Sequence, residues 1–359
     1  MGAPLASTTE AQAERTSALD VAAIEAWFAG HLPNMRIPLQ ICLIAGGHSN
    51  LTYRIDDAAG QRFVLRRPPV GKLHSRAHDV AREYRIFAAL SGTSVPVPGV
   101  AALCSDPAVI GAPFYVMRWV EGTVVDSPEV AVSALPTDRL RTRAAEHVVD
   151  CLAALSRLDV DAIGLGSLGP RENFVARQLE RLRSVWEKTK TRELPIIESL
   201  YERLMVARPP QVHTGLVHSD YRIGNLMLDA SGRVAAVLDW ELCAIGDVLA
   251  DLGFLINNWD GPDDPAPGVW MREAPTRAAG FPDRAQIVAR YAEQTGFNVA
   301  DLNYYRAFCY WRIAVIGEGV KRRYETGAMA GERVNVAAME RRIQGRADLT
   351  DHFLRLSDG

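Results

Sequence analysis

The sequence lacks any run of 18 consecutive apolar residues, so it predicts no membrane-spanning helix. Its first 20 residues also lack a basic start followed by an apolar run, and we therefore expect no secretory signal. The five cysteines are an odd number, lie far apart and form no CxxC pair, which argues against a disulfide framework or a zinc site. We expect free, buried thiols in a reducing, cytoplasmic setting at Cys42, Cys104, Cys151, Cys243 and Cys309.

An excess of charge of one sign is missing as well. The 40 basic and 43 acidic residues give a formal net charge of -3 and a pI near 6.3. A protein that binds nucleic acid or an anionic membrane needs a concentrated positive surface, whereas the arginines here are dispersed. The phosphate-binding pattern GxxxxGK[ST] is also absent, which argues against a P-loop nucleotide hydrolase. We predict no nucleic-acid partner and no membrane partner, and the sequence leaves the oligomeric state open.

The length of 359 residues exceeds what one compact core usually holds, so we expect two lobes. Residues 1–20 are small and polar and are predicted to form a flexible tail. The boundary between the lobes is predicted near residue 120, where the pattern changes from strands to helices. The predicted organisation is therefore a tail, a first lobe over residues 21–120 and a second lobe over residues 121–359.

The first lobe has the pattern of a small antiparallel sheet. After a short helix over residues 21–29, three β-rich runs separated by turn-forming clusters predict a meander. A helix is predicted from about residue 75 to residue 90, because Val80, Tyr84 and Phe87 share one face. The predicted strands are 39–44, 51–56, 62–67, 100–104 and 114–120.

The second lobe is mainly helical. Its predicted helices are 137–157, 174–188, 196–206, 284–295, 304–325 and 332–354. The fold class is therefore α+β, with a small antiparallel sheet and one key helix in the first lobe and a mainly helical second lobe.

One segment, LVHSDYRIGNLMLDASGRVAAVLDWE over residues 216–241, interrupts the helical pattern. LML and VAAVL are two short strands joined by a turn, so Asn225 precedes the first strand and Asp239 follows the second. A hairpin brings that amide oxygen and that carboxylate to one end of a sheet, where they suit Mg²⁺. Asp220 lies in the loop that enters the hairpin and can accept a proton from a substrate hydroxyl.

This segment resembles the catalytic and metal-binding loops of the aminoglycoside phosphotransferase family, which shares the fold and the phosphoryl-transfer chemistry of protein kinases. The resemblance extends from about residue 38 to about residue 325 and implies a two-lobed, protein-kinase-like fold. It implies that Asp220 positions the attacking hydroxyl, and that Asn225 and Asp239 hold Mg²⁺. His218 matches the loop histidine, for which we expect a structural role.

Two longer stretches carry a second, narrower resemblance. RRPPVGKLHSRAHDVAREYRIFAAL and VLDWELCAIGD are similar to the kinase-type domain found fused to, or encoded near, acyl-CoA dehydrogenases. That subgroup implies phosphorylation of hydroxylated acyl chains. In the continuation GDVLADLGFL, Asp247 and Asp251 are expected one helical turn apart in structural roles, with Asp247 as an N-cap.

The first lobe contains two residues of opposite charge that are expected to pair with each other. Glu83 lies on or beside the buried stripe of its helix, where a carboxylate needs a partner. The kinase-like pattern supplies one on the third strand, where Arg66 replaces the lysine of protein kinases and is implied to contact phosphate. The alternative is an exposed Glu83 that pairs locally with Arg82 or Arg85.

The nucleotide is expected to meet two further segments. In the turn AGGHSNLTY, glycines permit close backbone approach, and Ser49, Asn50 and Thr52 can donate to phosphate. The strand FYVMRWVEG leads into the expected interlobe hinge near residues 117–122, where backbone groups near Met117 and Trp119 would meet adenine.

These observations predict an ATP-dependent phosphotransferase, with GTP as an alternative donor, Mg²⁺ as cofactor and a small-molecule hydroxyl as acceptor. The acceptor is either hydroxyacyl-type or aminoglycoside-like. An acidic site would suit an aminoglycoside, and an apolar surface would suit an acyl chain. The acidic candidates are Asp260, Asp263, Asp264 and Glu318, and the apolar ones are Trp311, Ile313, Val315 and Ile316.

Two other functions fit parts of the pattern. A metal-dependent hydrolase could use His213, His218, Asp220 and Asp239 as a mixed cluster, although the histidines form no HExxH pair. Because that pair is missing, His213 is better explained as a loop or core residue. A pseudokinase would bind nucleotide without catalysis, but the three acidic and amide positions of the pattern are all filled.

Overall fold

The computed structural model describes residues 19–46, 50–68, 79–261, 273–327 and 335–357. Its chain divides into two units. The first comprises the described residues up to Glu121 together with Ala236–Leu242, and the second comprises Gly122–Ala235 and the described residues from Cys243 onward. The tail predicted over residues 1–20 falls outside the described residues up to residue 18, whereas Leu19 is buried and Asp20 caps the first helix.

The first unit contains a five-stranded antiparallel sheet in the order β1-β2-β3-β5-β4. The predicted meander is therefore confirmed as one part of a larger sheet. Its elements are helix α2 (Val21–His31), strands β1 (Gln40–Gly46), β2 (Leu51–Asp56) and β3 (Arg62–Arg67), helix α3 (Val80–Leu90), and strands β4 (Val100–Cys104) and β5 (Phe114–Arg118).

Several predicted boundaries in this unit need correction, among them those of the first helix, which ends at His31, and of the first strand, which spans Gln40–Gly46. Helix α3 begins at Val80, because the Asp79 side chain accepts a hydrogen bond from the Arg82 N–H and caps it there. Residues 75–78 of the predicted helix lie outside the described residues. Strand β5 ends at Arg118 rather than at residue 120.

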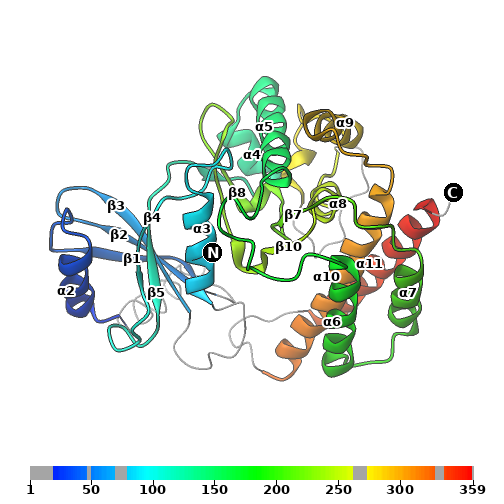
Figure 1. Ribbon diagram of the computed structural model, residues 1–359, viewed down its shortest axis with the longest axis horizontal. Coiled ribbons are helices and arrows are strands. Elements are labelled where there is room, and N and C mark those ends of the chain that lie inside the picture. Colours follow the sequence, from blue (N-terminus) through cyan, green and yellow to red (C-terminus); the bar gives the residue numbers. More distant parts are fainter. Residues whose placement is uncertain (1–18, 47–49, 69–78, 262–272, 328–334, 358–359) are drawn as a thin grey trace, which may run out of the picture. The chain divides into compact units, whose positions relative to one another are not determined.

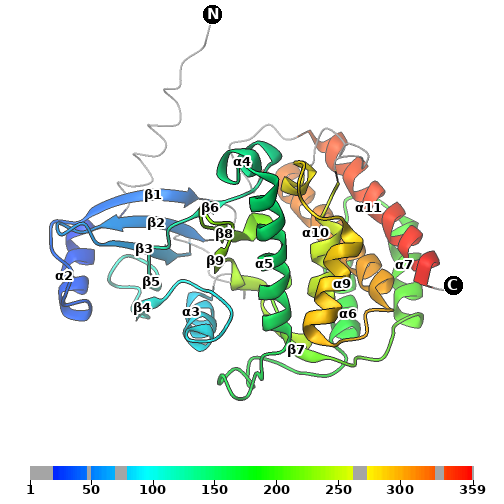
Figure 2. The ribbon, with the colours of Figure 1, turned by 90° about the horizontal axis from the view of Figure 1, so that it is seen from above.

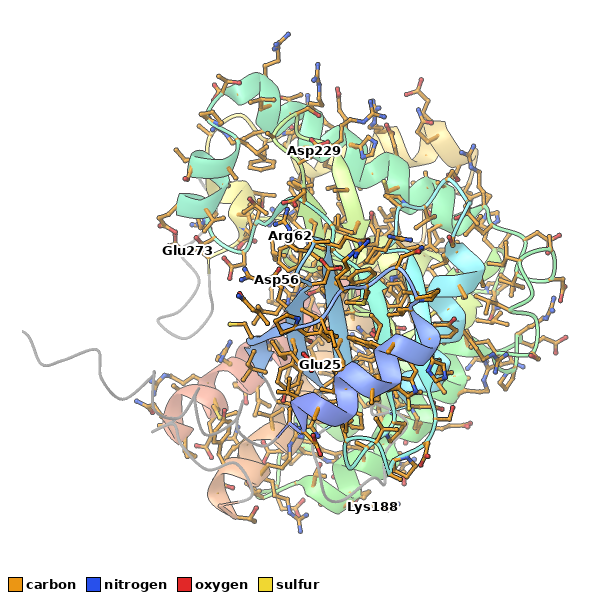
Figure 3. All side chains as sticks on the ribbon, turned by 90° about the vertical axis from the view of Figure 1, so that its left-hand side faces the viewer. Glu25, Asp56, Arg62, Lys188, Asp229 and Glu273 are labelled. Atoms are coloured by element: carbon orange, nitrogen blue, oxygen red, sulfur yellow. The ribbon has the colours of Figure 1, made fainter. Side chains whose placement is uncertain are left out.

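Helices α2 and α3 cover opposite faces of the sheet (Figure 1). Ile24 and Phe28 of α2 pack against Tyr53 and Phe63 in one apolar core. Burying each such side chain contributes about 1.5–3 kcal/mol, so this packing fixes α2 on the sheet. Glu25, labelled on α2 in Figure 3, adds a polar link, since its Oε1 accepts a hydrogen bond of 2.7 Å from the Leu39 N–H.

The second unit is mainly helical, as predicted, and also holds short strands. Its helices are α4 (Pro128–Ala134), α5 (Asp138–Ser156), α6 (Phe174–Thr189), α7 (Pro195–Val206), α8 (Leu249–Asn257), α9 (Arg284–Thr295), α10 (Leu302–Glu325) and α11 (Val336–Ser357). Its strands are β6 (Thr123–Val124), β7 (Thr214–Val217), β8 (Leu226–Leu228) and β10 (Ala244–Asp247); strand β9 (Val234–Val237) runs across the division between the units. Three short 3₁₀ turns complete the described elements: η2 (Ile223–Asn225), η3 (Trp240–Leu242) and η4 (Pro275–Arg277).

Caps and long-range pairings shape the second unit. Thr137 caps α5, which therefore begins at Asp138, one residue after the predicted start. A reciprocal capping box of Asp283 and Gln286 starts α9 at Arg284, as predicted. Figure 2 shows α9 lying alongside α5. The predicted hairpin is confirmed, with β8 and β9 neighbours in a sheet of order β6-β8-β9. The sequence did not predict strand β6, helix α4 or the antiparallel pair of β7 and β10.

Two expectations from composition can be compared with the structure. In the parts of the chain that the structure describes, every helix is too short or too polar to span a bilayer. The five cysteines are free thiols, and four of them are buried. Cys42 is exposed, which corrects the expectation of burial at that position.

Candidate active site

Arg66 lies at the centre of a polar cluster in the first unit. Alternate side chains of β3 face opposite sides of the sheet, so Phe63 and Leu65 enter the core beneath α2 while Arg66 faces α3. The Arg66 Nε lies 3.2 Å from Glu83 Oε2, and Glu83 is only 2% exposed. The predicted ion pair between the third strand and the helix is present, and the alternative of an exposed Glu83 is wrong.

Two more carboxylates share the same guanidinium. Arg66 Nη2 lies 3.0 Å from Asp239 Oδ1 and 3.8 Å from Glu241 Oε2. Asp239 directly precedes η3, has a left-handed φ of 63° and keeps 35% of its side chain exposed. We name Arg66, Glu83, Tyr115, Asp239 and Glu241 the Arg66 cluster.

The electrostatics of the Arg66 cluster keep the guanidinium charged. Burial opposes that charge, but the surrounding negative groups, led by Glu83, outweigh burial and raise the Arg66 pKa. Burial raises the pKa of Glu83, and the charge of Arg66 pulls it back. Tyr115 is fully buried beside Glu83, and burial together with that carboxylate raises its pKa. The cluster therefore presents a permanent cation, which a phosphate can bind, beside a partly exposed carboxylate.

The residues predicted to meet phosphate lie where β1 turns into β2. Ser49 lies outside the described residues. Asn50 is buried, and its Oδ1 has no hydrogen-bond partner among the residues that the structure describes. Thr52 is half-buried on β2 and lies opposite Arg66 in the strand register. The turn thus offers one buried amide oxygen, a hydrogen-bond acceptor without a partner among the described residues, next to the strand that carries Arg66.

The segment predicted to meet adenine ends the central strand β5. Met117 is buried between β3 and β4, opposite Val64 and Val100. The Trp119 N–H donates to the Arg62 carbonyl over 3.2 Å. That amide is thereby committed within the sheet, so a hydrogen bond from the Trp119 N–H to a base would have to replace an existing one.

Asp220 lies in the second unit, in the loop between β7 and β8 that we name the 218–225 loop. Its Oδ2 accepts a hydrogen bond of 2.7 Å from Asn225 Nδ2, which also donates to the Asp220 carbonyl over 2.8 Å. Arg222 Nε lies 3.6 Å from the other carboxylate oxygen. The Asp220 side chain remains 26% exposed, so an oriented carboxylate faces the surface of this unit.

The 218–225 loop is anchored through its backbone. Asp251 of α8 accepts hydrogen bonds from the His218 N–H over 2.5 Å and from the Ser219 N–H over 2.8 Å. Burial raises the pKa of Asp251, while the nearby charges of His218 and Arg312 lower it. His218 is fully buried, and its Nδ1 accepts the Asp220 N–H over 3.2 Å. These contacts agree with a structural role for His218 and Asp251.

Asp247 does not have the predicted position. It is the last residue of β10, and the N-cap of α8 is Val248, so Asp247 and Asp251 are not one helical turn apart. Pairing of β10 with β7, opposite Thr214, draws Asp247 into the strand. Its carboxylate accepts from the Tyr305 hydroxyl over 2.5 Å and from the Leu249 N–H over 3.2 Å. Burial raises its pKa to about 6.

The two predicted Mg²⁺ ligands have suitable chemistry. Both hydrogen bonds of the Asn225 Nδ2 go to Asp220, so the atom that this side chain can offer a ligand is its oxygen. Asp239 offers a carboxylate that pairs with the Arg66 guanidinium and is partly exposed. An amide oxygen and a carboxylate oxygen suit Mg²⁺, which usually keeps phosphate and water as its remaining ligands. Asp239 belongs to the first unit and Asn225 to the second.

The histidines of the alternative metal cluster have other surroundings. His213 directly precedes β7 and stacks on Phe297 with ring centroids 3.8 Å apart, whereas His218 directly follows β7. The strand of four residues between them puts their Cα atoms roughly 16 Å apart, so the two rings cannot share one ion. Among the described residues, no group of three or more His, Cys, Asp or Glu side chains is arranged to hold a metal ion.

The residues considered for acceptor binding are largely committed to the interior. Glu318 is fully buried and accepts hydrogen bonds from the Thr191 N–H and hydroxyl. Asp260 pairs with Arg284 over 3.0 Å, and Asp263 and Asp264 lie outside the described residues. On α10, Trp311 and Val315 are buried in the core, and Ile313 and Ile316 are half-buried.

The sequence did not reveal three of the polar residues around these sites. Tyr115 and Glu241 belong to the Arg66 cluster, and Arg312 contacts the backbone of the 218–225 loop. Glu241 had a signal in its position two residues after Asp239. Arg312 had one too, since an arginine between Trp311 and Val315 interrupts an apolar stretch.

Comparisons with known proteins show the family to which the chain belongs. Residues 40–287 match the model of the APH phosphotransferase enzyme family. The chain is 32% identical over 316 residues to acyl-CoA dehydrogenase family member 10 of Mus musculus, over 87% of this chain but 29% of that protein. The chain thus spans less than half of the length of the curated relatives it matches.

Solved structures give the same result for the fold. A candidate aminoglycoside phosphotransferase from Ralstonia eutropha aligns with a TM-score of 0.77 and 32% identity, over 94% of this chain and 98% of that chain. The ADP-bound aminoglycoside phosphotransferase APH(2'')-Ib aligns with a TM-score of 0.58 and 15% identity, over 94% of this chain and 99% of that chain. The predicted α+β, protein-kinase-like class and the predicted family resemblance are confirmed.

Proposed function

The chain belongs to the phosphotransferase enzyme family, and on that premise we propose that it transfers the γ-phosphoryl group of Mg·ATP to a hydroxyl group of a small molecule. The observation that carries the proposal is the Arg66 cluster. One guanidinium is held by the buried Glu83 and also touches Asp239, the residue at the predicted metal-ligand position. A phosphate and a cation are the partners that such a guanidinium and carboxylate would take when nucleotide binds.

Each residue has a defined part in this reaction. Arg66 binds the phosphates of the nucleotide, and Glu83 holds Arg66 in place. Asp239 and Asn225 hold Mg²⁺, which when bound neutralises charge on the transferring phosphoryl group. Asp220 orients the acceptor hydroxyl and accepts its proton while the acceptor oxygen bonds to Pγ and the bond from Pγ to the β,γ-bridging oxygen breaks.

The residues that we propose to contact the nucleotide also belong to the first unit. Asn50 would donate its side-chain N–H groups to the phosphates, with the hydroxyl groups of Ser49 and Thr52 as further donors. Met117 and Trp119 border the adenine, and ATP is the proposed donor, with GTP as the alternative. The APH(2'')-Ib structure with ADP supports an adenine nucleotide by analogy of fold.

A hydroxyacyl compound is the acceptor that we propose first, ahead of an aminoglycoside. A polycationic acceptor needs uncompensated carboxylates, but Glu318 is buried and Asp260 is ion-paired. The name of the mouse relative, an acyl-CoA dehydrogenase family member, supports an acyl substrate. The proposal therefore extends to an alcohol on an acyl chain.

An ADP-release screen tests the proposed function. The chain is incubated with Mg·ATP and, separately, with hydroxyacyl-CoA thioesters, aminoglycosides, amino alcohols and sugars. We expect ADP release that depends on one added alcohol and is lost in Asp220→Asn. Nucleotide binding without ADP release for any alcohol would favour a pseudokinase, and phosphate-ester cleavage without ATP would favour a hydrolase; either result would overturn the proposal.

A further inference from the structure

The residue immediately before Asp220 has a strained backbone. Ser219 has a left-handed φ of 70°, a conformation that costs a residue with a side chain about 1–3 kcal/mol. The surrounding structure must therefore hold Ser219 in place. Because Ser219 shares a peptide group with Asp220, the orientation of its carbonyl group also sets the direction in which the chain enters Asp220.

Two helices of the second unit hold the peptide groups on both sides of Ser219. Its N–H donates to Asp251 of α8 over 2.8 Å, and its carbonyl accepts a hydrogen bond from Arg312 Nη2 of α10. The next N–H, that of Asp220, donates to His218 Nδ1 over 3.2 Å. The strained turn is thus fixed by one acidic side chain and one basic side chain that reach it from different helices.

Arg312 is buried in a way that stability alone does not explain. Only 6% of the residue is exposed, and its Nε has no hydrogen-bond partner among the described residues. Its guanidinium lies over the Phe254 ring at 5.1 Å, and its charge opposes the rise that burial causes in the pKa of Asp251. Burial of a charged pair is costly and often contributes little net stability, so the contact with Ser219 indicates a positional role.

We propose that Arg312 is a positioning residue for phosphoryl transfer, acting on Asp220 through the Ser219 carbonyl and through the charge of Asp251. This inference rests on the proposed function. With Arg312 in place, the Asp220 carboxylate is directed at the acceptor hydroxyl while Asn225 holds its Oδ2. Without Arg312, the hydrogen bond from the Asp220 N–H to His218 is left as the described restraint on the peptide between Ser219 and Asp220, and we expect the carboxylate to be held less firmly in one direction. A displacement of about 1 Å at a reacting group costs roughly 10²-fold in rate.

The first test compares Arg312→Met with Arg312→Lys. Lysine keeps the charge and can donate to the Ser219 carbonyl, whereas methionine keeps only the apolar stem. The probe is ADP release from Mg·ATP with water as the acceptor. We expect Arg312→Met to lower kcat by about 10²-fold with the KM for ATP unchanged, and Arg312→Lys to restore a large part of the loss.

Arg141→Met is the matched control. Arg141 is also 6% exposed and also donates to backbone carbonyls, those of Leu135 and Ala279, but it lies on α5 and contacts other segments. We expect its loss to lower thermal stability while kcat stays near that of the unaltered chain. Equal losses of kcat in Arg141→Met and Arg312→Met would overturn the proposal, because they would indicate a general effect of losing a buried arginine.

A double variant tests whether Arg312 acts through Asp220. In an Asp220→Asn background, adding Arg312→Met should cause no further loss of kcat, because the carboxylate that Arg312 positions is already absent. A further loss as large as in the unaltered chain would contradict the proposal.

Hydrogen exchange gives a readout that does not depend on activity. In Arg312→Met we expect faster amide exchange in the 218–225 loop, and in Arg141→Met we expect that loop to be unchanged. Unchanged exchange of the loop in Arg312→Met would overturn the inference. If the unaltered chain releases no ADP with water or any alcohol, the proposed function fails, and the exchange experiment still decides whether Arg312 holds the loop.

Discussion

The Arg66 cluster and the 218–225 loop are both polar and partly buried, but they are held together in different ways. In the Arg66 cluster the contacts join side chains to side chains, and one guanidinium is shared among Glu83, Asp239 and Glu241. The 218–225 loop also contains a side-chain pair, Asn225 with Asp220, but the contacts that anchor it to the helices join buried side chains to its backbone, through Asp251 and Arg312.

This difference indicates what each region can change during a reaction. Ion pairs among side chains can be exchanged for a phosphate or a metal ion at little cost, because each charge keeps an opposite charge beside it. Backbone hydrogen bonds to buried groups cannot be exchanged without leaving a polar group unpaired. The Arg66 cluster is therefore suited to take up and release nucleotide, and the 218–225 loop is suited to keep Asp220 fixed.

Loss of the Asp220 carboxylate should give the largest effect. We expect Asp220→Asn to lower kcat by about 10³-fold or more, because it removes the proton acceptor and the group that orients the hydroxyl. The KM for ATP should change little, since Asp220 lies outside the Arg66 cluster. Steady-state kinetics with Mg·ATP measure both constants, and near-normal turnover in this variant would refute the assigned mechanism.

Removal of the charge at Asp239 should give the next largest effect. Asp239→Asn keeps the shape of the side chain but loses the anionic ligand, so we expect the Mg²⁺ concentration for half-maximal rate to rise about 10-fold or more. Titration of the rate with Mg²⁺ measures this shift. Glu241→Gln is the control from the same cluster, and an equal shift in both variants would contradict a specific ligand role for Asp239.

Changes at Arg66 and Glu83 should act mainly on nucleotide affinity. Arg66→Met removes a charge-assisted contact worth about 1.5–3 kcal/mol, which corresponds to a rise in the KM for ATP of roughly 10–100-fold. Arg66→Lys should fall between Arg66→Met and the unaltered chain, and Glu83→Gln should resemble Arg66→Lys. An unchanged KM for ATP in all three variants would show that the Arg66 cluster does not bind the nucleotide.

Asp247 should give the smallest effect, on stability rather than on turnover. Its pKa is about 6 in the folded chain, above the ordinary aspartate value, so the folded state binds the proton more tightly than the unfolded state. Its contribution to stability is complete below about pH 4 and is lost as the pH rises through about 6. Between pH 4 and pH 7, the free energy of unfolding of Asp247→Asn should therefore rise by about 2.5 kcal/mol relative to that of the unaltered chain. Denaturant unfolding at a series of pH values measures this difference, and a constant difference would show that Asp247 titrates normally.

Much of the first unit could be predicted from the sequence because its signals are local. Alternating apolar residues and turn clusters gave the strands, and the position of Glu83 on a buried helical stripe predicted an ion pair with Arg66 that is present. The hairpin of β8 and β9 was predicted for the same reason, since its turn lies between the two strands.

The rest depends on contacts between distant segments. Asp247 precedes a helix and therefore resembles an N-cap, but pairing of β10 with β7 makes it part of a strand. The hydrogen bond from Arg312 to Ser219 joins residues 93 positions apart, and no local pattern predicts it. In the sequence, Arg312 is a charged residue within an apolar stretch. This pattern indicates that its side chain is buried but does not identify the residue it contacts.

The central claim is direct transfer of a phosphoryl group from ATP to an alcohol. The measurement that tests it most directly uses ATP with ¹⁸O-labelled γ-phosphoryl oxygens in unlabelled water, with mass spectrometry of the acceptor and of inorganic phosphate. We predict a phosphate ester of the acceptor that retains the labelled oxygens, and no such product from Asp220→Asn. Labelled inorganic phosphate without any phosphorylated acceptor would contradict the claim.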